Sequence, residues 1–390
     1  MKVKYYVIAI SLFFLYGCYE KELTPISESL GKPGPVTEIV TAAIPGGVEV
    51  SYKIPNNEDL LTVKAVYTLS NGKKYEQTSS FYENKIVIQG FYDTKEHEAM
   101  FYTVNRAQVM SDPVTVRFTP LESPLANIAR SIDIIQDFGG AQFRWKNEDK
   151  YPINLEFFTT DSVGKMQLIR ILTSELPESN FSLRGYTPTP RDFAIVVRDN
   201  YGNAIDTVRK NLVPLFEERF DKKRMSIMKL ANDANFTNWE GLDSYIIDDN
   251  LETFGHSPAN ALPAAFTIDM GVVGKVSRVV FFNRFFNDSY YSWGNPKDLK
   301  IYGRTEKPAL SGDWNEWGEP IIAGAQIKPS GLPSGTDTDE DVSYAEGGFE
   351  FVFPLDVAPL RYIRVQILST WTGPTYTHPA EVDIYGEEEK

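Results

Sequence analysis

A strict alternation of apolar and polar residues occurs twice in the N-terminal half of this chain. The first run covers residues 46–54 and the second covers residues 139–146; each is followed by an Asn-Glu-Asp triplet and another alternating run. The apolar positions of the first run are Val48, Val50, Tyr52 and Ile54. Because successive side chains of a strand point to opposite faces, these runs predict half-buried β-strands. Their repetition, without helix-period segments, predicts two similar β-sandwich domains.

The composition excludes several classes of function. Of 390 residues, 42% are hydrophobic and 24% charged, which is globular composition for a chain of two to three domains. The net charge of −14 disfavours binding to nucleic acid or to anionic lipid surfaces. A single cysteine excludes an internal disulfide, a thiolate zinc site and an iron–sulfur cluster, and three histidines leave little for an imidazole metal centre.

Residues 1–18 have the organisation of an export signal. Lys2 and Lys4 precede an apolar run that is too short to span a bilayer, and Gly17-Cys18 ends it. This ending resembles the lipobox of bacterial lipoproteins, which implies that Cys18 is acylated and becomes the mature N-terminus. The alternative is a soluble secreted protein in which this cysteine occurs by chance. Residues 19–36 are predicted to be a tether without core residues.

The two repeats correspond to predicted domains at residues 37–121 and 122–220. Both are free of cysteine and have aromatic residues in their strands, and they look like fibronectin type III or immunoglobulin-like sandwiches. Tyr52 and Trp145 are expected to anchor their cores. Neither repeat contains a nucleophile and base, or a carboxylate pair, at an interpretable spacing. Both are therefore predicted to be spacers or surfaces on which a partner docks.

The C-terminal third contains five of the six tryptophans and a third set of short strands. The predicted strands cover residues 265–271, 276–282, 299–303 and 361–367. Each run is apolar or alternating and is bounded by turn residues, which predicts an all-β jelly roll. The predicted fold class of the whole chain is therefore all-β, with two sandwiches followed by a jelly roll.

A series of segments in this third domain resembles the discoidin family, also known as the coagulation factor 5/8 C-terminal family. The segments that carry the resemblance, in order, are residues 247–253, 266–271, 276–284, 295–303, 361–365 and 380–386. The resemblance covers about residues 225–390 and implies the galactose-binding-like fold, which many carbohydrate-binding modules have. The arrangement of lipobox, two sandwiches and this domain also resembles Bacteroidales surface lipoproteins of polysaccharide-utilisation loci.

The resemblance further implies a structural calcium ion. Sugar binders of this family have a loop of the type Asp-Gly-(Asp/Asn)-x-x-Thr and a Glu near the C-terminus. The implied ligands here are Asp248, Asn250, Thr253 and Glu381. Such hard oxygen donors suit calcium, but Asp249 stands where the family has Gly. The alternative is an Asx-rich turn satisfied by its own backbone.

A second acidic segment, residues 337–341, does not have the spacing of an EF-hand. Val342 stands where that loop needs Gly, and Gly348 stands where it needs a bidentate Glu. Because glycine, proline and serine precede the segment, an exposed mobile loop is predicted.

Two loops of the third domain are unusually aromatic, at residues 285–294 and 369–378. Aromatic rings pack on the C–H faces of sugar rings, while polar groups nearby hydrogen-bond the hydroxyls. The resemblance adds an Arg at the end of the preceding strand. The predicted carbohydrate-binding residues are Arg284, Tyr290, Tyr291, Trp293, Trp371, Tyr376 and His378. In the alternative interpretation, Trp293 and Trp371 pack beneath their own loops, and Arg284 pairs with Asp288 or Asp298.

These features predict a non-catalytic, lipid-anchored protein of the outer membrane, facing the cell exterior, that binds a polysaccharide or oligosaccharide. Outer-membrane transport proteins are expected as partners. The alternative is a structural lipoprotein that docks a membrane partner or an adhesin target. An enzyme is disfavoured because the three predicted domains leave no segment large enough for a catalytic domain.

Overall fold

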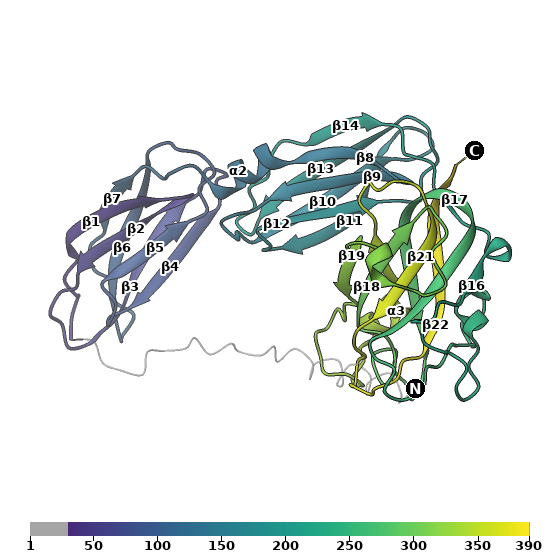
Figure 1. The fold of residues 1–390 in the computed structure, drawn as a ribbon. Helices are drawn as coiled ribbons and strands as arrows, with labels where there is room; N and C mark the ends of the chain where they lie inside the picture. Colours follow the sequence, from purple (N-terminus) through teal and green to yellow (C-terminus); the bar gives the residue numbers. More distant parts are fainter. Residues whose placement is uncertain (1–29, 390) are drawn as a thin grey trace, which may run out of the picture.

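The computed structural model describes residues 30–389, which form three β domains in succession (Figure 1). This confirms the predicted all-β class with two sandwiches followed by a curled sheet. Cys18 lies outside the described residues. Within the described part of the chain, no helix is both long and apolar enough to cross a membrane.

The first domain is a sandwich of two antiparallel sheets. One sheet contains β1 (Thr37–Ile44), β2 (Gly47–Lys53) and β5 (Lys85–Gln89). The other, in spatial order, contains β4 (Lys74–Ser80), β3 (Leu60–Thr68), β6 (His97–Asn105) and β7 (Val114–Phe118). Val48, Val50 and Tyr52 are buried, as the alternation predicts. The end of the predicted tether differs from expectation, because Val36 belongs to this core.

The second domain repeats this sandwich. Its smaller sheet contains β12 (Glu178–Leu183), β9 (Gly140–Lys146) and β8 (Asp133–Asp137). Its larger sheet contains β11 (Met166–Ser174), β10 (Ile153–Thr160), β13 (Arg191–Asp199) and β14 (Val208–Leu212). Trp145 is buried in the core, as predicted. A short helix not foreseen from the sequence, α2 (Pro124–Ser131), joins the two sandwiches; Ser123 caps it and Pro124 begins it.

The third domain is an eight-stranded antiparallel sheet that curls around its own core. Its strands are β15 (Glu218–Arg219), β22 (Pro379–Glu388), β17 (Ala264–Asn283), β21 (Leu360–Ile367), β18 (Asp298–Arg304) and β19 (Ile322–Ala325), with β16 (Ser226–Met228) and β20 (Phe349–Val352) paired to β17. Residues 265–271 and 276–282, predicted as two strands, are one strand, β17. Its register on β21 is irregular between Asp269 and Gly274, and its second half pairs with β22.

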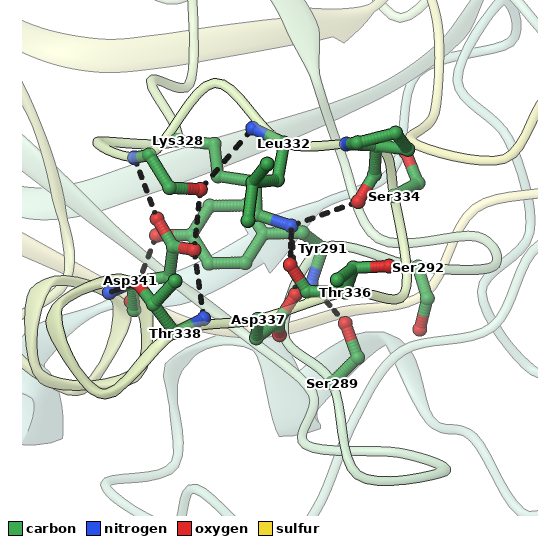
Figure 2. Close-up of polar contacts among 12 residues, drawn as sticks. Ser289, Tyr291, Ser292, Lys328, Leu332, Ser334, Thr336, Asp337, Thr338 and Asp341 are labelled. Atoms are coloured by element: carbon green, nitrogen blue, oxygen red, sulfur yellow. Dashed lines mark hydrogen bonds and ion pairs between the residues drawn. The ribbon is translucent and has the colours of Figure 1, made fainter.

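The acidic segment at residues 337–341 is exposed only in part. Asp339 and Glu340 are exposed, as expected of a solvated loop, but the other two carboxylates of the segment are held by polar contacts (Figure 2). Asp341 is buried and forms a capping box with Thr338 at the start of α3 (Asp339–Glu346). The buried ammonium of Lys328 donates to the carbonyls of Pro333 and Thr336 at 3.0 and 2.8 Å and pairs with Asp337 at 2.9 Å. A buried cation, which the sequence pattern did not reveal, therefore fixes this loop.

Polar contacts join the three domains. The Tyr201 turn of the second domain lies against the first, where Asn203 Nδ2 donates to the Gly90 carbonyl at 2.9 Å. At the other junction, Glu217 accepts from the Ser277 hydroxyl at 2.5 Å and from the Arg278 guanidinium at 3.2 Å. These contacts place the third domain at the end of a row of two sandwiches (Figure 1).

Candidate functional site

The third domain contains an aromatic hollow of about 380 Å³ at the end where β17 stops and β22 starts. Antiparallel pairing sets Asn283, the last residue of β17, opposite Pro379, the first residue of β22. Arg284 and His378, the neighbouring residues, are therefore brought to the same edge of the sheet. The hollow is lined by Trp239, Glu240, Phe254, His256, Arg284, Phe286, Asn287, Trp293, Tyr376 and His378.

A third segment completes the wall of the hollow. The backbone N–H of Gly255 donates to the carbonyl of Pro379 at 2.9 Å, and that of His256 donates to Phe236 at 3.0 Å. In the turn that carries Trp239, the backbone N–H of Asn238 donates to the carbonyl of His256 at 3.0 Å. Backbone hydrogen bonds thus hold residues that are distant in sequence against the edge of the sheet.

Arg284 lies between two phenylalanine rings. Its guanidinium carbon is 3.7 Å from the ring centroid of Phe254 and 4.5 Å from that of Phe286. Its backbone is fixed by Asn295, which accepts from the Arg284 N–H at 3.0 Å and donates to its carbonyl at 2.8 Å. Burial lowers the pKa of Arg284 and the charge of Glu240 opposes that shift, but the guanidinium remains a cation.

The guanidinium of Arg284 has no hydrogen-bond or ion-pair partner among the described residues. The sequence alternative, in which it pairs with Asp288 or Asp298, is not what the structure has; Asp298 instead accepts from the Ser369 hydroxyl. A guanidinium without a partner has free hydrogen-bond donors. This partly buried group is therefore available to a ligand.

Two tryptophans that line the hollow are exposed to solvent. Trp239 is 87% exposed and Trp293 is 44% exposed. Both have a φ of +52°, and Asn287 between them has a φ of +49°. Left-handed backbone is unusual for residues other than glycine and is often found at functional sites. The Trp293 ring also packs edge-on against Phe286, with centroids 5.9 Å apart.

Neutral imidazoles form the inner part of the hollow. The Gly294 N–H donates to Nε2 of His378 at 3.0 Å, and His256 is bonded through Nδ1 to the Ser257 carbonyl at 2.7 Å and stacks on Tyr376 with centroids 4.8 Å apart. Burial lowers the pKa of His378 to about 3 and also lowers that of His256. Both rings are therefore uncharged at neutral pH. The charged groups of the lining are Arg284 and Glu240.

The structure brings together four of the seven residues predicted to bind carbohydrate: Arg284, Trp293, Tyr376 and His378. Tyr291 is a correction, because its ring is completely buried and its hydroxyl donates to the Asp341 carbonyl at 2.9 Å. Trp371 is partly buried and packs edge-on against Tyr291 of the other aromatic loop, with centroids 4.9 Å apart, so it lies outside the hollow but not beneath its own loop alone.

Tyr290 lies in a separate hollow of about 420 Å³ on the far side of the 285–286 turn. Its ring is 4.8 Å from that of Phe285, and Glu252 and Glu346 line the same hollow. Arg284 is common to the linings of both hollows.

Sequence reasoning missed six of the ten residues that line the aromatic hollow. The overlooked residues are Trp239, Glu240, Phe254, His256, Phe286 and Asn287. Trp239 gave the one usable signal, since it stands between polar and turn-forming residues in Asn238-Trp239-Glu240-Gly241. Phe254 and His256 gave none, because an aromatic residue near a turn is as typical of a core.

The loop predicted to hold calcium forms an Asx-type turn. Both carboxylate oxygens of Asp248 accept from the Thr253 hydroxyl, at 3.0 and 2.9 Å, and Glu381 accepts from the Asn250 N–H at 3.2 Å. The ammonium of Lys222 lies 2.9 Å from the other oxygen of Glu381. Within residues 30–389 no group of three or more His, Cys, Asp or Glu side chains is arranged to hold a metal ion. The side chains of Asp248, Thr253 and Glu381 are thus engaged by one another's loop and by Lys222.

Three family models match the chain in succession, each described as a domain of unknown function. DUF4959 matches residues 33–120, DUF5126 matches residues 121–223 and DUF5000 matches residues 231–386. No curated protein matches the chain.

Several solved structures are similar to parts of this chain. A SusE-like protein is 29% identical, with 67% of this chain and 98% of that chain covered and a TM-score of 0.44. The C-terminal domain of a chitobiase from Bacteroides fragilis is 18% identical, with 44% and 100% covered and a TM-score of 0.32. A CBM32 domain of a family 31 glycoside hydrolase from Clostridium perfringens is 15% identical, with 43% and 96% covered and a TM-score of 0.29.

Proposed function

We propose that the third domain binds carbohydrate in the aromatic hollow and that the protein is a non-catalytic glycan-binding protein. The observation that carries the proposal is an unpaired guanidinium, that of Arg284, beside two solvent-facing indoles, Trp239 and Trp293. Indole faces pack against the C–H faces of a sugar ring, and a guanidinium with free donors hydrogen-bonds ring hydroxyls. A volume of about 380 Å³ lies within the range of small-ligand sites.

The charges in the hollow favour binding over hydrolysis. Glycosidases mostly use two carboxyl groups about 5 to 10 Å apart on either side of the scissile bond. Among the described residues that line this hollow, Glu240 is the one carboxylate. The imidazoles of His256 and His378 are held neutral by burial, and His378 uses Nε2 to accept a backbone hydrogen bond. The set supports recognition of hydroxyl groups without an acid and base pair.

The rest of the chain suits a protein that holds glycan at the cell surface. We propose that Cys18 carries the lipid anchor in the outer membrane, with the domains facing the exterior. Two sandwiches then separate the anchor from the binding domain. Outer-membrane transport proteins are the partners that this arrangement favours, since captured glycan has to be passed on.

Glycan binding is tested with the chain lacking residues 1–18, on a glycan array and by affinity electrophoresis in gels that contain polysaccharide. Wild type is expected to be retarded by at least one polysaccharide, and Trp239→Ala and Trp293→Ala are expected to lose most of that retardation. Tyr82→Ala is the matched control, because Tyr82 is 84% exposed in the first domain and far from the hollow.

Two results would contradict the proposal. One is a wild-type protein that no glycan retards; a stoichiometric protein partner recovered in that case would support the alternative role in docking. The other is retention of full glycan binding by both tryptophan variants, which would place the binding surface elsewhere. Hydrolysis of a retained glycan would overturn the non-catalytic assignment.

A further inference from the structure

A buried lysine lies against three carboxylates beside the 248–253 loop. Lys222 is in a short 3₁₀ helix, η1 (Lys222–Arg224), and its side chain is 4% exposed. Its Nζ atom is 2.5 Å from Asp383 Oδ1, 2.9 Å from Glu381 Oε1 and 3.2 Å from Asp249 Oδ1. Glu381 and Asp383 are two residues apart on β22, so their side chains lie on one face of the strand. The ammonium thus connects the segment entering the domain with its last strand.

The oxygens that a divalent cation would require are engaged by groups of the protein itself. Glu381 accepts from the N–H groups of Val382 and Asn250 at 2.9 and 3.2 Å, in addition to its ion pair with Lys222. The Arg219 guanidinium adds a second cation, 2.8 Å from Asp249 and 3.3 Å from Asp383. Buried carboxylates are costly unless they are paired, and here two basic side chains pair with them.

Asp249 adds a third, more exposed carboxylate beside the lysine. It stands where the resembling loops have Gly, and it has a φ of +65°, the left-handed conformation that Gly adopts most easily. The loop therefore keeps a glycine-like backbone but gains a carboxylate. That carboxylate is directed at Lys222 and Arg219. The additional carboxylate of Asp249 is thus paired with the cations of Lys222 and Arg219.

We propose that the Lys222 ammonium takes the place of a divalent cation at this loop, so that the third domain folds without calcium. The ammonium, on a covalently attached side chain, lies within ion-pair distance of Glu381, Asp383 and Asp249 together, and Arg219 supplies a second positive charge. Because Lys222 follows Glu217 and Arg219 closely in sequence, the same charge also fastens the connection from the second domain to β22. The site is then independent of the calcium concentration outside the cell.

Removing the ammonium should allow these carboxylates to bind a metal ion. In Lys222→Met the side chain stays unbranched and apolar along its stem but loses the ammonium, which leaves three acidic groups near one another with one cation, Arg219. Carboxylate, amide and hydroxyl oxygens are the ligands that calcium prefers. Burial raises the pKa of Glu381 to about 7 with Lys222 beside it, and loss of the ammonium raises that pKa further, so the calcium titration of the variant is made well above pH 7.

The test is thermal unfolding of the full chain without its signal peptide, in EDTA and in excess CaCl₂, with calcium binding measured by titration calorimetry. The wild-type midpoint is expected to be the same in both solutions, with no calcium heat. Lys222→Met is expected to unfold about 10 °C lower in EDTA, since breaking a buried pair is strongly destabilising, and to regain part of that loss in calcium. Lys223→Met, next to it and exposed, is the control and should behave as wild type.

Stoichiometric calcium binding by the wild type, or a wild-type midpoint that rises in calcium, overturns the proposal. So does a Lys222→Met variant that is as stable as wild type in EDTA. If Lys222→Met does not fold, Lys222→Met/Asp383→Asn replaces it; removing one of the unpaired carboxylates should recover part of the stability. Failure of that double variant to recover any stability would also count against the proposal.

Discussion

Replacing Arg284 with methionine separates a binding role from a structural one. The substitution removes the guanidinium, whose carbon is 3.7 and 4.5 Å from the ring centroids of Phe254 and Phe286, and leaves a shorter, unbranched apolar side chain beside these rings. Because no described residue pairs with the guanidinium, the free protein loses cation–π attraction and no hydrogen bond. A ligand in the hollow would lose every hydrogen bond that the guanidinium donates to it.

The two effects have different magnitudes. A hydrogen bond to a charged group contributes about 1.5 to 3 kcal/mol, so its loss weakens glycan binding by about 10- to 100-fold. In the folded protein, the lost cation–π attraction of about 0.5 to 2 kcal/mol is offset by methionine–aromatic contacts of about 0.3 to 1.5 kcal/mol and by relief of the partly buried charge. The free energy of unfolding should therefore change by less than about 1 kcal/mol.

Glycan affinity by titration calorimetry and stability by urea denaturation, measured on the same preparations, check this prediction. Arg361→Met is the control, because Arg361 is ion-paired with Asp269 at 2.8 Å, and Asp269 would lose that partner. It should lose stability and keep its affinity, which is the opposite pattern. A variant Arg284→Met that binds glycan like wild type, or that loses more stability than Arg361→Met, would refute the reasoning.

Three further changes have defined outcomes. Lys328→Met leaves Asp337 buried without its partner and should lower the free energy of unfolding by about 3 to 5 kcal/mol in urea, with part recovered in Lys328→Met/Asp337→Asn. His378 has a native pKa of about 3 against 6.5 unfolded, so stability should fall as the pH drops from 6.5 toward 3, by at most about 1.4 kcal/mol per pH unit; His378→Gln should have a shallower slope in denaturation midpoints. Gly294→Ala sets a Cβ 2.8 Å from the rings of His378 and Tyr376 and should abolish glycan retardation, while Gly324→Ala, in β19 with its Cβ in ordinary contact at 3.5 Å, should retain it.

The architecture could be predicted because side-chain alternation is a local property. In β2 the buried residues Val48 and Val50 flank the partly exposed Glu49, and this pattern reads directly from the sequence. The same rule could not show that residues 264–283 form one strand, because the irregular register near Gly271 depends on how β21 pairs with it. Helix α2 was overlooked although Ser123-Pro124 is a readable start signal.

The site was only partly predictable, because composition gives the aromatic content of a loop but not the direction of its rings. In residues 285–294 left-handed backbone at Asn287, Asp288 and Trp293 breaks the alternation, so that Trp293 faces out while Tyr291 is buried. Trp239 joins the hollow only through tertiary pairing.

Lys222 was missed for a related reason. In Asp221-Lys222-Lys223-Arg224 it looks like part of a solvated run of charges, and nothing local shows that one of these cations is buried.

The first two sandwiches are closely packed where they meet. Gly90 has a φ of +109°, and a Cβ at that position would lie 2.6 Å from the Tyr201 ring, whose carbonyl is held by Asn71 at 3.2 Å and by the Tyr75 hydroxyl at 3.3 Å. The Tyr201 ring therefore fixes the angle between the first two domains. A single methyl group at residue 90 would displace this ring and so change the orientation of the second and third domains relative to the first. It would do so without contacting any residue of the aromatic hollow.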